Sequence, residues 1–194
     1  MGSLNSSPLD VGGLAVALID GLAFPEAPRW RADRLWYSDI FGGRVGHVGL
    51  DGSPATVLEL DDHPSGLGWL PDGDLIVVSM QRRLLLRVDA DGRTNVHADL
   101  TPHITWPAND LLVLPDGVAY VGHFGFDRQH GTTPRAPASL LCVEPDGTVR
   151  TAASDLEFPN GMATRQGPEG EPSVLVVAES GAGRITEFDI GPGG

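Results

Sequence analysis

The chain has 194 residues, of which 41% are hydrophobic, and no run approaches the ~20 consecutive apolar residues that span a bilayer. Its 26 acidic residues outnumber its 13 basic ones, and the formal net charge of -13 repels phosphate backbones and anionic lipid surfaces. We therefore expect no nucleic acid and no membrane among its partners, whereas metal cations are favoured.

The N-terminal stretch MGSLNSSPLDVGGLAVALIDGL has no positive residue before its modest apolar run. It lacks the charged start of a secretory signal, so we expect a cytoplasmic location. We predict a flexible segment over residues 1–13 and one domain over residues 14–194. Within that domain, LAVALIDGL (residues 14–22) is expected to be a strand without a partner in its own sheet.

Short apolar runs are separated by tight-turn signals along the rest of the chain. Asp-Gly pairs stand at residues 51/52, 72/73, 91/92, 116/117 and 146/147. Both residue types tolerate the backbone of a tight turn, and Asp-Gly between apolar runs is a strong hairpin signal. The chain is therefore predicted to be a series of β-hairpins.

A longer repeat appears when these hairpins are aligned. The segments FPEAPRW, HPSGLGW, WPANDLLV and FPNGMAT open units that start near residues 24, 63, 106 and 158. The second unit then offers the strands GLGWL, DLIVVSM, LLLRVDA and TNVHADL, and the third offers NDLLV, VAYVGHF, ASLLCVE and TVRTAA. Repeats of about 40 to 50 residues with four strands each are typical of β-propeller blades. A β-sandwich is the alternative all-β fold.

The fourth unit contains GMATRQGPEGEPSVLVVAES and GRITEFDI, and its outer strand is missing before the final GPGG, which ends at Gly194. We therefore expect an incomplete propeller of about four blades, either a fragment or a truncated product. Such an arc exposes apolar surface and unpaired strand edges, which favours self-association through open blade edges.

The repeated motifs place oxygen-bearing side chains at related positions: Glu26, Ser65, Asn109 and Asn160. In a propeller these positions converge at the mouth of the central channel. One carboxylate with amide oxygens and water suits a hard cation such as Ca²⁺, whereas zinc prefers His or Cys. Taken singly, Glu26 could be a surface or capping acid, and each Asn could belong to an ordinary turn or cap.

The segments FPEAPRW, PANDLLV, YVGHFGFD, FPNGMA and VVAESGAGRITEFDI together resemble the SMP-30/gluconolactonase/LRE-like family, which includes regucalcin. The resemblance runs from about residue 14 to the C-terminus and corresponds to the N-terminal part of the family. It implies a six-bladed propeller in which a divalent cation, often Ca²⁺, supports hydrolysis of sugar lactones. It also implies that Glu26 and Asn160 bind the metal, and that Asn109 contacts the substrate, or the substrate and the metal together.

The chain departs from this family in two places. The family's channel Asp, thought to act as the base, belongs to a later blade and is expected beyond Gly194, so we expect no catalytic residue in the chain and an impaired activity. Sugar-lactone-hydrolysing relatives carry an arginine where this chain has Pro107. Asp127 lies about where such relatives have an acidic substrate contact, although a solvated loop acid is equally compatible with the sequence.

Other polar residues have two interpretations each. His123 is either a substrate contact or a hydrogen-bonded structural histidine, and the insert over residues 127–137 is either a lid or a disordered loop. Ser65 and His63 do not form the pattern of a nucleophilic serine site. Cys142 is expected to be a buried hydrophobic residue, and the four tryptophans are expected to pack mostly between blades.

The leading hypothesis is a Ca²⁺-dependent hydrolase of small-molecule lactones or related esters. A phosphotriesterase-like hydrolase on the same scaffold is the first alternative. A calcium-binding or interaction propeller without enzymatic activity is the second.

Overall fold

The computed structural model describes residues 17–128 and 130–191, and the elements in this part of the chain are all β-strands. No helix in the described part has the length and apolarity needed to cross a membrane. The strands are β1 (Pro25–Arg31), β2 (Arg34–Asp39), β3 (Arg44–Gly49), β4 (Pro54–Glu59), β5 (Pro64–Trp69), β6 (Leu75–Ser79), β7 (Leu84–Val88), β8 (Thr94–Asp99), β9 (Ala108–Val113), β10 (Ala119–His123), β11 (Ala138–Val143), β12 (Val149–Leu156), β13 (Pro159–Gln166), β14 (Pro172–Glu179) and β15 (Arg184–Asp189).

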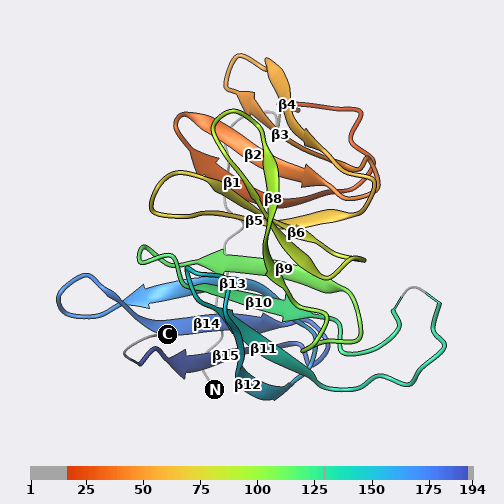
Figure 1. Ribbon diagram of the computed structural model, residues 1–194, viewed down its shortest axis with the longest axis vertical. Coiled ribbons are helices and arrows are strands. Elements are labelled where there is room, and N and C mark those ends of the chain that lie inside the picture. The colour runs from red at the N-terminus through yellow and green to blue at the C-terminus, as the bar shows by residue number, and fades with distance from the viewer. Residues whose placement is uncertain (1–16, 129, 192–194) are drawn as a thin grey trace, which may run out of the picture.

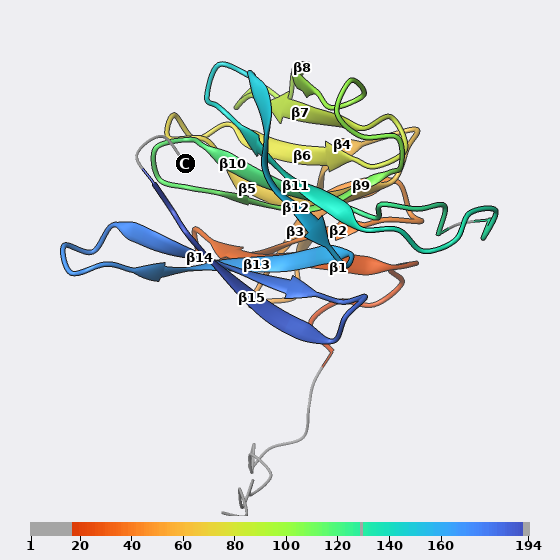
Figure 2. The same cartoon turned by 90° about the horizontal axis from the view of Figure 1, so that it is seen from below.

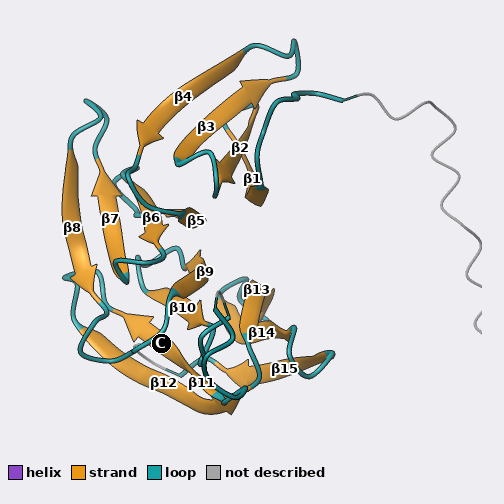
Figure 3. Ribbon diagram, turned by 90° about the vertical axis from the view of Figure 1, so that its right-hand side faces the viewer, coloured by secondary structure: helices purple, strands orange, loops and turns teal. Residues whose placement is uncertain are grey.

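The strands form four antiparallel sheets, each made of strands that are consecutive in the chain (Figure 1). The first three sheets, β1 to β4, β5 to β8 and β9 to β12, have four strands, and the last, β13 to β15, has three. The sheets are arranged as the blades of an open arc, with β1, β5, β9 and β13 on its inner side (Figure 3). This confirms the predicted incomplete propeller of about four blades and excludes a β-sandwich.

The hairpin turns follow from the Asp-Gly pairs. The glycines of all five pairs have φ between 78° and 97°, a backbone conformation that glycine adopts without a steric penalty. In four of these turns the Asp side chain accepts a hydrogen bond from the N–H group two residues later. Local sequence therefore determines where each blade reverses direction.

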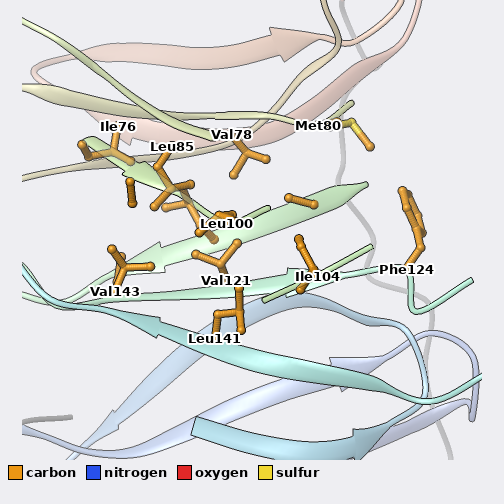
Figure 4. Packing of buried hydrophobic residues seen from close by; sticks show 14 of the residues in the cluster. Ile76, Val78, Met80, Leu85, Leu100, Ile104, Val121, Phe124, Leu141 and Val143 are labelled. Atoms are coloured by element: carbon orange, nitrogen blue, oxygen red, sulfur yellow. The ribbon is translucent and has the colours of Figure 1, made fainter. Parts of the chain in front are cut away.

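Apolar side chains pack between neighbouring blades. Between the second and third blades, Ile76, Val78 and Leu85 meet Val121 and Leu141, and all five are fully buried (Figure 4). Burying one such side chain contributes ~1.5–3 kcal/mol of transfer free energy. Similar clusters join the first blade to the second and the third blade to the fourth. These contacts fix each blade relative to the next.

Two expectations at the first blade were wrong. Residues 17–22 form no strand, and residues 14–16, like the predicted flexible segment 1–13, lie outside the described residues. Trp30 is 57% exposed in β1 instead of packing between blades. Within the described residues, β1 and β2 of the first blade pack against β5 of the second, and Figure 3 shows the first and last blades at the two ends of the arc.

The last blade is described as far as Gly191. Its sheet has three strands within the described residues, as the sequence of the fourth unit predicts. Gly194, beyond which the family's channel Asp is expected, lies outside the described residues together with residues 192 and 193. The structure therefore does not test where the catalytic Asp lies, and its place beyond Gly194 stays a prediction.

Candidate active site

Four polar residues occupy equivalent positions in the four blades. Glu26, Ser65, Asn109 and Asn160 are each the second residue of an innermost strand. In every blade, the first residue of that strand pairs with the last residue of the second strand. Because the register is the same in all four blades, these four positions lie at one level of the arc. When the four motifs are aligned on their prolines, Asn109 falls one residue later than its counterparts. The reason is that Pro107 lies before β9, and Ala108 is the first residue of that strand.

A cavity of about 810 Å³ lies at this level. It receives Glu26, Asn109, Asn160 and Asp127 from the predicted set, whereas Ser65 and His123 are not among its lining residues. The other lining residues are Phe24, Ile40, Phe41, His63, Met80, Gln81, Arg83, Thr105, Trp106, Pro107, Phe124, Arg128, His130, Phe158 and Ser180. The cavity thus combines aromatic walls with convergent polar groups, as binding sites for small molecules do.

The two asparagines belong to one hydrogen-bonded chain. Asn109 Nδ2 donates to Asn160 Oδ1 at 3.0 Å, and Asn160 Nδ2 donates to Ser180 Oγ at 3.1 Å. Asn109 is buried, Asn160 is half-buried and Glu26 is exposed toward the cavity. The amide oxygen of Asn160 is therefore held in place, while the carboxylate of Glu26 is accessible to a ligand.

Buried carboxylates fix the segments that lead into two of these strands. Asp39 Oδ1 accepts hydrogen bonds from the N–H groups of Ala23 and Phe24, at 2.9 and 2.8 Å, and its other oxygen pairs with Arg44. Burial opposes ionisation of Asp39, but the N–H donors and Arg44 outweigh it and lower the pKa. These hydrogen bonds hold the segment before β1 in place, and they therefore position Glu26 in that strand.

The last blade repeats this arrangement with a longer acid. Glu179 is 1% exposed, forms a two-point ion pair with Arg184 at 2.8 and 2.9 Å, and accepts the N–H of Glu157 at 2.7 Å. The hydrogen bond from Arg184 is the main reason why the pKa of Glu179 falls to about 2. Glu157 lies three residues before Asn160, so this clamp orients the approach to β13.

Asp127 lines the cavity, but its oxygens bind the adjacent loop. It is 6% exposed, its Oδ1 accepts the His130 N–H at 2.9 Å, and its Oδ2 accepts the Thr132 hydroxyl. The Thr132 hydrogen bond is the largest of the contacts that lower the pKa of Asp127 to about 2. Asp127 therefore anchors the start of the connection between β10 and β11, which extends beyond the ends of the strands (Figure 2).

His123 is a buried histidine whose ring is held on both sides. Nδ1 accepts the Gly125 N–H at 3.1 Å, and in that tautomer Nε2 carries the proton and donates to Ser139 Oγ, which lies 3.1 Å away. Burial lowers the pKa of His123 to about 4, so the ring is neutral near pH 7. These contacts agree with the interpretation of His123 as a structural histidine, which is one of the two that the sequence allows. His123 is not among the residues that line the cavity.

The donor set fits a hard cation better than a soft one. Glu26, Asn109 and Asn160 offer one carboxylate and two amide groups, and Ca²⁺ takes ~6 to 8 oxygen ligands that include carbonyls and water. Within residues 17–128 and 130–191 no group of three or more His, Cys, Asp or Glu side chains is arranged to hold a metal ion. A site of the zinc type is therefore not supported by these residues.

Sequence reasoning missed two arginines of the cavity wall, Arg83 and Arg128. Arg83 lies in the turn between β6 and β7, and Arg128 follows Asp127 in the insert. The available signal was positional: aligning residues 80–83 with 40–43 and 180–183 places Arg83 where the other two turns have glycine.

Four consecutive sheets with a cavity at the start of their innermost strands define a β-propeller segment with a candidate ligand site. A sequence model of the SMP-30/gluconolactonase/LRE-like region matches residues 24–194. The chain therefore belongs to the SMP-30/gluconolactonase/LRE-like family. A search of curated proteins gives no significant match.

Solved structures extend the comparison. A gluconolactonase from Xanthomonas campestris is 28% identical, with a TM-score of 0.70, over 89% of this chain and 60% of its own length. Regucalcin from Agrobacterium tumefaciens, described as a calcium-binding protein, shares the fold at 19% identity, with a TM-score of 0.69 over 90% of this chain and 56% of its own. A luciferin-regenerating enzyme shares it at 20% identity, with a TM-score of 0.70 over 87% of this chain and 56% of its own. The chain thus spans less than two thirds of these relatives.

Proposed function

We propose that the chain carries part of the active site of a Ca²⁺-dependent lactone hydrolase of the gluconolactonase type. The supporting observation is that Glu26, Asn109 and Asn160 occupy the same position in three innermost strands and line one cavity. Membership of the family and the similarity to a gluconolactonase agree with this proposal. The same proposal includes a small-molecule lactone as the partner and a cytoplasmic location.

The residues of the chain have distinct tasks in this proposal. Glu26 and Asn160 Oδ1 would hold a divalent cation, which supplies Lewis acidity at the carbonyl of the lactone when it is bound. Asn109 donates to Asn160 Oδ1, so it orients that amide and offers its own oxygen to substrate or metal. The aromatic rings of the cavity wall exclude water around the ester. The proton acceptor is expected beyond Gly194, and we expect the 194-residue chain alone to hydrolyse lactones weakly or not at all.

Calorimetric titration with CaCl₂ tests the site directly. We expect saturable binding to the chain, loss of binding in Glu26→Gln, and unchanged binding in Glu59→Gln, because Glu59 is an exposed acid at the end of β4, away from the cavity. Equal binding by all three proteins would contradict the proposed site. Because the chain alone is expected to turn over little, a panel of lactones and phosphotriesters, with and without CaCl₂, is assayed on a longer chain that includes the expected proton acceptor. The panel separates the two hydrolase classes, and metal binding without turnover by that longer chain would support the non-enzymatic alternative.

A further inference from the structure

Arg83 occupies a backbone position that is glycine in two other blades. The turn between the second and third strands has the same geometry at Gly43, Arg83 and Gly183, with φ of 62°, 56° and 62°. Gly43 O accepts the Leu60 N–H at 2.8 Å, and Arg83 O accepts the Leu100 N–H at 3.0 Å. A side chain in this left-handed region strains the backbone, so arginine is present at this position despite its effect on stability.

The guanidinium group of Arg83 lies against the loop that leads to β9. Nη1 donates to Thr105 O at 3.0 Å and to Ile104 O at 3.4 Å. Nε is buried and has no hydrogen-bond partner within the described part of the chain. An unsatisfied buried donor destabilises the fold, which is a second unfavourable feature of this residue. The arginine nevertheless lines the cavity.

Arg128 reaches the same cavity from the insert. Its guanidinium carbon lies 5.3 Å from the ring centre of Phe124 and 5.1 Å from that of Phe158. Aromatic faces hold a guanidinium group while leaving its N–H edge available to hydrogen-bond acceptors. The adjacent acid, Asp127, directs its oxygens to Thr132 and His130 instead of Arg128.

Among the described residues, neither arginine forms an ion pair with a carboxylate, although the chain carries a formal net charge of -13. The charge of Arg83 acts on Asp99, whose pKa it helps to lower, and the cavity is also lined by Glu26 and Asp127, but neither guanidinium group is paired with a carboxylate. Two guanidinium groups without such a pair in one cavity suit an anionic ligand group, because they bind carboxylates with favourable geometry. We propose that Arg83 and Arg128 bind a carboxylate of the substrate other than the ester that is hydrolysed. This assigns the substrate class as lactones of hydroxy diacids, and it rests on the proposed function.

Binding of glucarate to metal-stripped protein tests this pair without any turnover. We expect saturable binding that weakens with added NaCl, and no binding of glucitol, which has the same carbon chain and no charge. Arg83→Gly is expected to weaken glucarate binding at least about tenfold while leaving the unfolding temperature unchanged or higher, because glycine suits this turn. Arg128→Gln is expected to weaken binding similarly. Arg82→Gln is the matched control, since Arg82 is a neighbouring cation outside the cavity wall.

Failure of glucarate to bind, or equal binding by the wild-type and Arg83→Gly proteins, would overturn the proposal. Glu26→Gln separates it from the proposed metal site. We expect this variant to retain glucarate binding in the absence of metal. If the protein binds glucarate but not CaCl₂, the arginine pair is supported and the metal-dependent function is contradicted. If it binds CaCl₂ but not glucarate, the metal site is supported and the arginine pair is contradicted.

Discussion

A carboxylate is stable inside a protein only where donors replace its water, and Asp39 and Glu179 meet this condition in the same way. Each ends the second strand of its blade, pairs with an arginine five residues later, and accepts backbone N–H groups from the segment before the innermost strand. Neither residue lines the cavity. Their effect on the site is therefore positional, through the strands that carry Glu26 and Asn160.

The pKa of Glu179 predicts a pH dependence of stability. Since the pKa falls from 4.5 to about 2 on folding, ionised Glu179 stabilises the protein fully above pH 4.5, and this contribution is lost as the pH decreases toward 2. Glu179→Gln should be less stable at neutral pH by about 2–3 kcal/mol, because Arg184 and the Glu157 N–H lose a charged acceptor.

Urea unfolding at a series of pH values measures this effect. The two stability curves should converge between pH 5 and pH 2, since the variant lacks the titrating group. Curves that stay parallel over this range would show that Glu179 does not contribute through its charge. Glu187→Gln is a suitable control, because the pair between Glu187 and Arg165 is exposed and such pairs contribute ~0–1 kcal/mol.

At the scale of the elements, the hairpin turns have two different roles. Gly73 and Gly147 both have positive φ, of 97° and 88°. A Cβ atom at Gly73 would meet no atom within 4 Å, whereas a Cβ atom at Gly147 would lie 2.2 Å from the carbonyl oxygen of His97 in β8. The turn between β11 and β12 therefore packs on the outer strand of the preceding blade.

This difference predicts unequal effects of the same substitution. Gly73→Ala should destabilise the protein by about 1 kcal/mol through backbone strain alone. Gly147→Ala should cost about 2–3 kcal/mol, because the turn must also move away from β8. Thermal or urea unfolding of the two variants measures the difference, and equal destabilisation would contradict the role assigned to the turn at Gly147.

The sequence was sufficient to predict the strands because turn residues mark them locally. It could not predict the offset at β9, where Pro107 lies before the strand instead of opening it, because that offset depends on pairing with β10. It placed Glu26, Asn109 and Asn160 at one site through the repeat. Arg83 and the orientation of His123 depend on contacts between distant segments, and the exposure of Trp30 depends on which blades are neighbours.

At the scale of the whole molecule, the first and last blades differ from the inner two. Exposed apolar side chains occur in both, with Trp30 at 57% in β1 and Ile185 at 65% in β15, and one also occurs in the second blade, where Val96 of β8 is 59% exposed. Figure 3 shows that these blades flank the opening of the arc. Apolar surface and unpaired strand edges favour association between copies of the chain.

We therefore expect the 194-residue chain to self-associate. Light scattering coupled to size-exclusion chromatography should give a mass above the 20.4 kDa of one chain, increasing with protein concentration. Trp30→Gln should shift the equilibrium toward the monomer if the first blade takes part. A concentration-independent mass of one chain would contradict this expectation.

The common register of the innermost strands has a consequence for how such a site can diversify. Each blade contributes one side chain at the second position of its innermost strand: Glu26, Ser65, Asn109 or Asn160. The strand register that sets this position is a property of the backbone, although Asn109 and Asn160 also hydrogen-bond to each other between the third and fourth blades. Exchange of one residue per repeat can therefore alter the donor set stepwise, so that new ligand preferences arise by point mutation on an unchanged backbone.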